Sequence, residues 1–207
     1  MKDNAITHVR FEPDSLCLEW ADGLVLSQPL TRYSRLQEAS AQARDSVEVL
    51  AQGTSVNWPE LGVKVEAVDW IWEHLCEAAM QRLHVLDWDL ERLTPVDQSI
   101  VALWRLEADG YNGGFLQFFC NWGDQTCTLA LQALAAIGAH ESHAVVSRQR
   151  QLIGHLEDHP QLETLWDIMQ LLSDEQHELI SGELDEQLWR AMEQVPALAA
   201  SYFYGRE

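Results

Sequence analysis

Two pairs of histidines have spacings that could bring imidazoles onto one metal ion. His155 and His159 are four residues apart, as in the helical pair of zinc metalloproteases. The glutamate that such a motif places directly after its first histidine is missing, and Pro160 moves His159 away from helical geometry. His140 and His143 are three apart near an expected helix start, where exposed histidines are common. We therefore expect no metal site.

Signatures of covalent catalysis and cofactor binding are also missing from the 207 residues. There is no nucleophile elbow and no phosphate-binding loop, and Gly110, Gly113 and Gly114 lack the spacing of a dinucleotide-binding turn. The four cysteines are scattered without a C-x-x-C pair, so neither a disulfide framework nor a zinc site is indicated. We expect no catalytic residue and no cofactor.

The carboxylates are more informative. The chain has 33 acidic and 13 basic side chains, a formal net charge of −20, and residues 157–207 hold 12 acids against Arg190 and Arg206. Such a surface repels nucleic acid and anionic membranes and attracts basic partners. An acidic face that serves solubility alone is the competing explanation. We expect the partner-binding residues to be Glu163, Asp167, Asp174, Glu175, Glu178, Asp185 and Glu186.

A second concentration of unusual residues lies at 109–122, D-G-Y-N-G-G-F-L-Q-F-F-C-N-W. Its Asn-Gly-Gly tolerates positive φ and predicts a sharp turn between a helix ending at Asp109-Gly110 and a second helix. Aromatics at 115, 118, 119 and 122 then share one helix face, and the amides at 117 and 121 could bond to each other or to the turn. Because such stripes usually form cores, we expect a structural motif made of Asn112, Gly113, Gly114, Phe115, Gln117, Phe118 and Asn121.

The elements before this stretch predict a small α+β module over residues 1–72. Alternating apolar residues over 5–30 indicate strands, with a hairpin turn at Ala21-Asp22-Gly23. Residues 36–50 have the apolar spacing of one helix, and 54–65 indicate a short strand in which Pro59 marks either a sheet edge or a strand end. The module is therefore a hairpin, a helix and a returning strand.

Two strings in this module carry a family resemblance. D-G-L-V-L-S-Q-P-L-T-R-Y-S-R-L-Q-E-A-S-A-Q-A-R and G-T-S-V-N-W-P-E-L-G-V-K-V resemble a small bacterial domain family of unknown function, over about residues 5 to 72. The acidic residues that usually follow the Trp-Pro strand are only partly kept, as Glu60 and Glu66. The resemblance implies a fold but no catalytic residue.

Residues 73–207 are expected to form a larger, all-α domain. Thr94 and Pro95 are the cap and first residue of one helix, and Gly138 ends another. We expect a helix from Pro160 that carries Glu163 and Asp167 one turn apart, and a short helix opened by a capping box at residues 173–176. A last helix over 184–202 should carry Asp185 and Glu186 beside its apolar stripe and be kinked or divided at Pro196.

This half carries the second resemblance. Y-N-G-G-F-L-Q-F-F-C-N-W-G-D, A-L-A-A-I-G-A-H and L-D-E-Q-L-W-R-A-M-E-Q-V are similar to the C-terminal helical domain of bacterial DNA-mimic proteins, over about residues 73 to 205. The resemblance implies an acidic homodimer that occupies the DNA-binding surface of a transcription factor.

Three functional hypotheses follow. The first is an acidic protein that blocks or sequesters a basic, DNA-binding partner; the second is an immunity-type inhibitor of a toxin enzyme; the third is an enzyme of unknown activity. No apolar run reaches the roughly 18 residues of a membrane span, and the N-terminus has no signal-like apolar region. We therefore expect a cytoplasmic protein that binds neither nucleic acid nor membrane.

Overall fold

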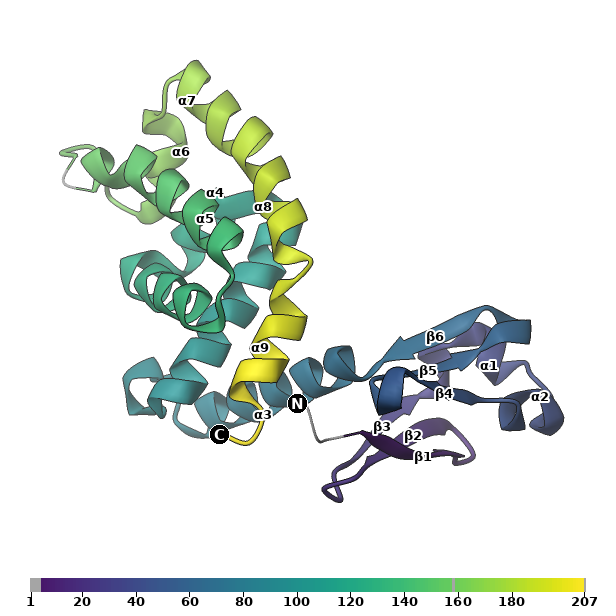
Figure 1. Cartoon of the computed structure of the whole chain (residues 1–207). Coiled ribbons are helices and arrows are strands. Elements are labelled where there is room, and N and C mark those ends of the chain that lie inside the picture. Colours follow the sequence, from purple (N-terminus) through teal and green to yellow (C-terminus); the bar gives the residue numbers. More distant parts are fainter. Residues whose placement is uncertain (1–4, 158, 207) are drawn as a thin grey trace. The chain divides into compact units, whose positions relative to one another are not determined.

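The computed structural model describes residues 5–157 and 159–206 (Figure 1). The chain divides into two compact units, Met1–His74 and Leu75–Glu207. The first holds two three-stranded antiparallel sheets and the second is helical, which confirms the α+β fold class.

The first sheet of the N-terminal unit contains the predicted hairpin. Strands β1 (Ile6–Phe11), β2 (Ser15–Trp20) and β3 (Val25–Pro29) pair in chain order. The Asp22 carboxylate accepts a hydrogen bond from the backbone N–H of Leu24 at 3.0 Å, and Gly23 has φ 91°. The central strand β2 pairs on both sides, and four of its six residues are buried.

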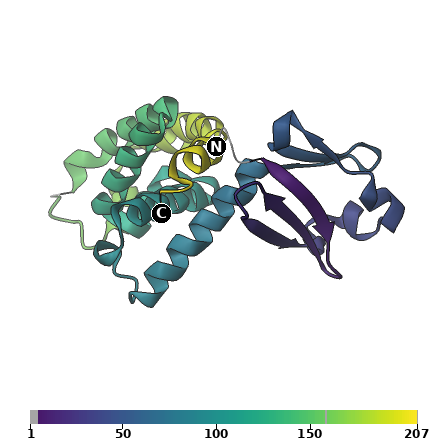
Figure 2. The same ribbon diagram turned by 60° about the horizontal axis from the view of Figure 1, so that its bottom comes forward.

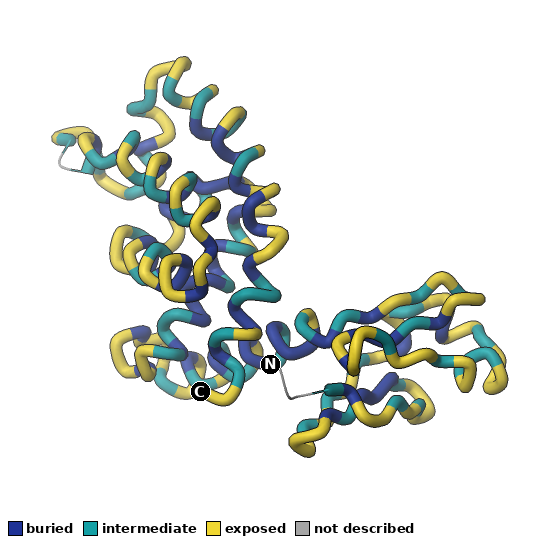
Figure 3. The backbone as a smooth tube through the Cα atoms, viewed as in Figure 1, coloured by how far each residue is buried: buried dark blue, intermediate teal, exposed yellow. Residues whose placement is uncertain are grey.

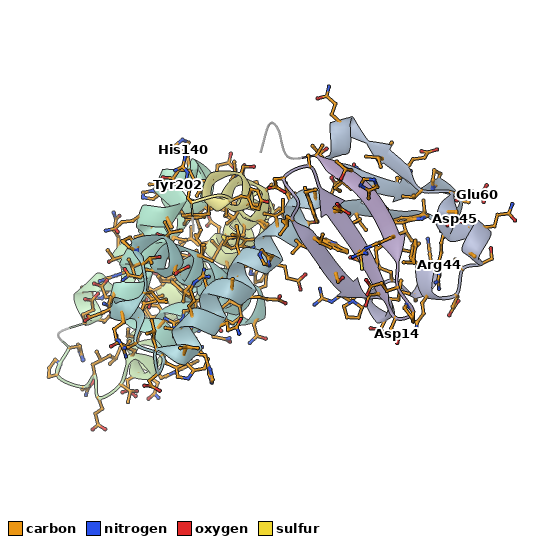
Figure 4. All side chains as sticks on the ribbon, turned by 90° about the horizontal axis from the view of Figure 1, so that it is seen from below. Asp14, Arg44, Asp45, Glu60, His140 and Tyr202 are labelled. Carbon is orange, nitrogen blue, oxygen red and sulfur yellow. The ribbon has the colours of Figure 1, made fainter. Side chains whose placement is uncertain are left out.

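The expected helix over 36–50 is wrong. The structure has a 3₁₀ turn (Leu30–Arg32), two short helices, α1 (Ser34–Gln37) and α2 (Ala41–Asp45), and a strand, β4 (Glu48–Leu50). Ser40 interrupts the helix because its side chain caps α2, accepting from the N–H of Ala43. Arg44, labelled in Figure 4, then donates to the carbonyls of Leu36 and Gln37 and holds α2 against the end of α1.

The expected single strand over 54–65 is instead a hairpin. A 3₁₀ turn (Ala51–Gly53) leads into β5 (Ser55–Trp58), and β6 (Val63–Glu66) pairs with it across a second 3₁₀ turn (Pro59–Leu61). Gly62 takes a left-handed φ of 60° and returns the chain. With β4 on the other side of β5, these strands form the second sheet.

Helix α3 (Ala67–Val85) follows, and a loop with a 3₁₀ turn (Leu90–Arg92) leads from it to α4 (Pro95–Ile137) (Figure 2). Thr94 caps α4 as predicted, with its hydroxyl accepting from the N–H of Asp97. Gly138 ends α4 with φ 79°. The remaining elements are α5 (His140–Ile153), a 3₁₀ turn (Gly154–Leu156), a second one (Leu165–Asp167), α6 (Ile168–Leu171), α7 (Asp174–Glu178), a π-helical segment (Leu179–Leu184), α8 (Asp185–Met192) and α9 (Val195–Phe203).

Helix α4 bends at glycines. It continues through Gly110, so the expected stop at Asp109-Gly110 is wrong, and its first break falls at Gly113-Gly114. Gly114 has φ 78° and ψ −173°, a conformation that is essentially confined to glycine, whereas Gly113 has an ordinary φ of −154°. A second break at Gly123, φ 71°, was not predicted. The three helical segments bury one side toward the core (Figure 3).

Two expectations for the C-terminal helices need correction. No helix begins at Pro160; the first helical turn after it starts at Leu165. Helices α7 and α8 are joined by the π-helical segment, so residues 174–192 are helical throughout rather than divided before Leu184. The expected division at Pro196 is confirmed, because α9 begins there with proline in its first turn.

Candidate partner-binding surface

The glycine break in α4 leaves room for a buried carboxylate, that of Asp185. The Asp185 Oδ1 atom accepts hydrogen bonds from the backbone N–H of Phe115 at 3.0 Å and from Gln149 Nε2 at 2.7 Å. A Cβ atom on Gly114 would lie 1.8 Å from Asp185 Oδ2, so only glycine fits. Asp185 thus acts as the N-cap of the helical segment that starts at Phe115, although it lies on α8.

This placement removes Asp185 from the expected partner-binding set. Its side chain is on the inner side of α8, and the residue is only 2% exposed. Burial raises the pKa of its carboxyl, while the bonds from Phe115 and Gln149 act in the opposite direction. Asp185 therefore has a structural position, and the sequence pattern placed it on the wrong side of the helix.

The phenylalanines of the expected motif pack in the core. Phe115 and Phe118 are fully buried and Phe119 nearly so, with ring centroids of Phe115 and Phe119 5.9 Å apart. Asn112 and Gly113 are exposed at the break. Trp122, the last aromatic of the expected face, is 38% exposed. Three of the four expected core aromatics are therefore in the core.

Gln117 and Asn121 bond neither to each other nor to the turn. Both donate to Asp109, Gln117 Nε2 to Oδ1 at 2.8 Å and Asn121 Nδ2 to Oδ2 at 3.0 Å, and the Trp122 indole N–H donates to the same Oδ2 at 2.6 Å. The Arg105 guanidinium lies over the Trp122 ring, 3.8 Å from its centroid. Asp109 therefore ties the segment before the break to the segment after it.

Four of the seven expected partner-binding residues are exposed on the long C-terminal helical run. Asp174, Glu175 and Glu178 are exposed on α7, as expected, and Glu186 is exposed on α8. A surface hollow is lined by the three α7 carboxylates together with Leu179 and Glu183. Glu183 lines the same hollow, although the sequence pattern did not single it out. It lies in the π-helical segment between α7 and α8, whose turns are wider than those of an α-helix.

Glu163 and Asp167 do not share a helix face. Asp167 Oδ2 accepts from the backbone N–H groups of Glu163 and Thr164 and from the Thr164 hydroxyl, which makes it part of a capping box. These bonds, first that from the Thr164 backbone, lower the pKa of the Asp167 carboxyl. Glu163 is exposed beside it. Both carboxylates thus remain at the surface, in a capped turn rather than a helix.

We call the exposed set the acidic strip: Asp174, Glu175, Glu178, Glu183 and Glu186. All five lie within 174–192, where Arg190 is the one arginine and lysine is missing. The Arg190 Nε atom donates to the Glu186 carbonyl rather than to a carboxylate. The strip therefore keeps most of its negative charge uncompensated.

Other chemistry-bearing residues lie apart from the strip. His140 is exposed at the start of α5 (Figure 4), and no group of three or more metal-binding side chains occurs among the described residues. All four cysteines are free and buried. Burial raises the pKa of Cys120 to about 11 and that of Cys127 to about 12, so neither thiol is ionised at neutral pH. No helix in the described ranges has the length and apolar content needed to cross a bilayer.

Fold and surface define an α+β protein whose helical unit presents a strip of carboxylates. The chain belongs to the DMP19-like protein family, whose model matches residues 91–205. Residues 6–68 match a second family model, described as a protein of unknown function (DUF2442). Both matches agree with the resemblances drawn from the sequence. No curated protein and no solved structure matches the chain.

Proposed function

We propose that the helical unit binds a basic, DNA-binding protein through the acidic strip and thereby keeps it from DNA. The observation that carries the proposal is the arrangement of five exposed carboxylates along one helical run. Membership of the DMP19-like family supports it, since resemblance to that family implies mimicry of DNA.

The spacing of the carboxylates in the strip suits a partner surface that binds the phosphates of DNA. Asp174 and Glu186 are twelve positions apart, which corresponds to about 18 Å of helix at about 1.5 Å per residue. One DNA strand carries a phosphate about every 3.4 Å, so about five phosphates span the same length. Five carboxylates over that distance match the charge density of a single strand, and a second strip is needed to resemble a duplex.

A second copy of the chain would supply that second strip. The DNA-mimic resemblance implies a homodimer, and pairing two helical units doubles the number of carboxylates that face one partner. Glu163 and Asp167 add charge at the capped turn that precedes α6. We accordingly propose a homodimer as the binding form and retain these two residues as outlying members of the surface.

Capture from a native cytoplasmic extract tests this function. The full-length protein is immobilised and washed at low and at high salt, and short duplex DNA is added as a competitor. Because surface charge pairs are screened by salt, the proposal expects a DNA-binding protein that is released by high salt and displaced by the duplex. Salt-resistant capture of a toxin enzyme would instead favour immunity, and capture of nothing at low salt would remove the proposal.

A further inference from the structure

A hollow of about 400 Å³ lies within the helical unit, between the last turns of α3 and the start of α4. Apolar side chains make much of its wall: Ala78, Val85 and Leu86 from the end of α3 and its loop, and Leu93 from the segment before α4. Val85 is 73% exposed, so an apolar surface lies open to solvent beside the hollow. The volume lies in the range of about 300 to 1,000 Å³ that small-molecule sites occupy.

The charged side chains in the wall are mainly basic, whereas the chain as a whole is acidic. Arg82, Arg92 and Asp97 line the hollow. Arg82 forms a two-point ion pair with Asp97, Nε to Oδ2 at 2.9 Å and Nη2 to Oδ1 at 2.5 Å, so these charges offset each other. The Arg92 side chain is exposed and has no hydrogen bond or ion pair to another described residue. The wall therefore has a net charge of about +1 by formal count, in a chain of −20.

We propose that this hollow binds a small monocarboxylic acid with an apolar body, of the size of a medium-chain fatty acid. The apolar wall covers the hydrocarbon part, because removing methylene groups from water is favourable. The Arg92 guanidinium pairs with the carboxylate of the ligand. The Nη1 atom of Arg82, which takes no part in the pair with Asp97, adds a second hydrogen-bond donor. The Thr94 hydroxyl lies in the same wall, where it accepts from Asp97 N–H and still has its own proton to donate.

The ligand is an anion rather than a neutral or cationic amphiphile. Arg92 would repel a cationic head group, and the carboxylate of Asp97 is already paired with Arg82. A neutral head would gain only the apolar contacts. The site is separate from the acidic strip and independent of the proposed function, because no residue is shared between the two sets.

Decanoate titrated into the full-length protein, followed by ligand-observed NMR and calorimetry, tests the site. Decanol is the neutral comparator. Arg92→Gln removes the carboxylate partner, and Arg148→Gln removes the same charge from an exposed position on α5 outside the hollow. Val85→Glu places a carboxylate at the apolar edge without disturbing the core, since Val85 is exposed. Thermal melts confirm that each variant folds.

Decanoate should bind more tightly than decanol, and Arg92→Gln should weaken decanoate by about fivefold, the effect of one exposed charge pair. Val85→Glu should also weaken it, and Arg148→Gln should leave it unchanged. The proposal is overturned if decanoate fails to bind at millimolar concentration. It is equally overturned if decanol binds as well, or if the Arg92 and Arg148 variants lose the same affinity.

Discussion

Replacing Gly114 by alanine is the most direct test of the close packing between the Asp185 carboxylate and the glycine break in α4. Two penalties add at this position. An L-residue at φ 78° and ψ −173° costs about 1 to 3 kcal/mol of backbone strain. The new Cβ atom would lie 1.8 Å from Asp185 Oδ2 and 2.6 Å from its Cγ, so the carboxylate must move. Its displacement loses the charge-assisted bond from the Phe115 N–H, about 1.5 to 3 kcal/mol for such bonds.

Together these penalties predict a loss of about 2.5 to 6 kcal/mol in the free energy of unfolding. Gly138→Ala is the matched control, because Gly138 also has a left-handed φ of 79° but no atom within 4 Å of its would-be Cβ. That control should cost only the backbone strain, about 1 to 2 kcal/mol. Urea unfolding of both variants beside the parent gives the comparison. Equal losses in the two variants would refute the close approach of Asp185 to the glycine break.

Phe118→Ala should lower the free energy of unfolding by about 3 to 5 kcal/mol, because the ring is fully buried, and a near-neutral result in urea unfolding would contradict the core assignment. Asp185→Asn probes the raised pKa of the buried carboxyl. A raised folded pKa stabilises the parent below its unfolded value of 3.8, and this contribution is lost as pH rises through the folded value. The free energy of unfolding of the variant, relative to that of the parent, should therefore increase as the pH is raised from 4 to 8. A stability difference that stays constant, or that decreases over this range, would refute the burial effect.

Local signals in the sequence predicted the features that depend on near neighbours. The Asp22-Gly23 turn, the Thr94 cap and the capping box at Ser173 each rest on bonds within a few residues, and all are present. Gly138 ends α4 for the same kind of reason. Failures such as the helix over 36–50 arose where one capping serine outweighed a helical apolar pattern.

The parts that sequence could not predict depend on distant contacts. Asp185 bonds to a backbone group 70 positions away, so its helical spacing alone placed it on the surface. Asp109 collects donors from 8, 12 and 13 positions further along, across a break whose geometry sets which side chains meet. Glu183 lies in a π-helical segment, whose wider turn a 3.6-residue period does not represent.

The central claim is that the acidic strip recognises a basic partner. Its most direct test is the association rate between the protein and a captured DNA-binding partner, measured at several salt concentrations. The Glu175→Lys/Glu178→Lys/Glu183→Lys triple variant reverses the strip, and Glu38→Lys/Glu48→Lys/Glu60→Lys makes the same charge change at exposed positions of the N-terminal unit. The strip variant should associate at least about tenfold more slowly at low salt, with a flattened salt dependence, while the control stays much closer to the parent. Equal slowing in both variants would mean that net charge alone steers the encounter, and it would contradict recognition by the strip.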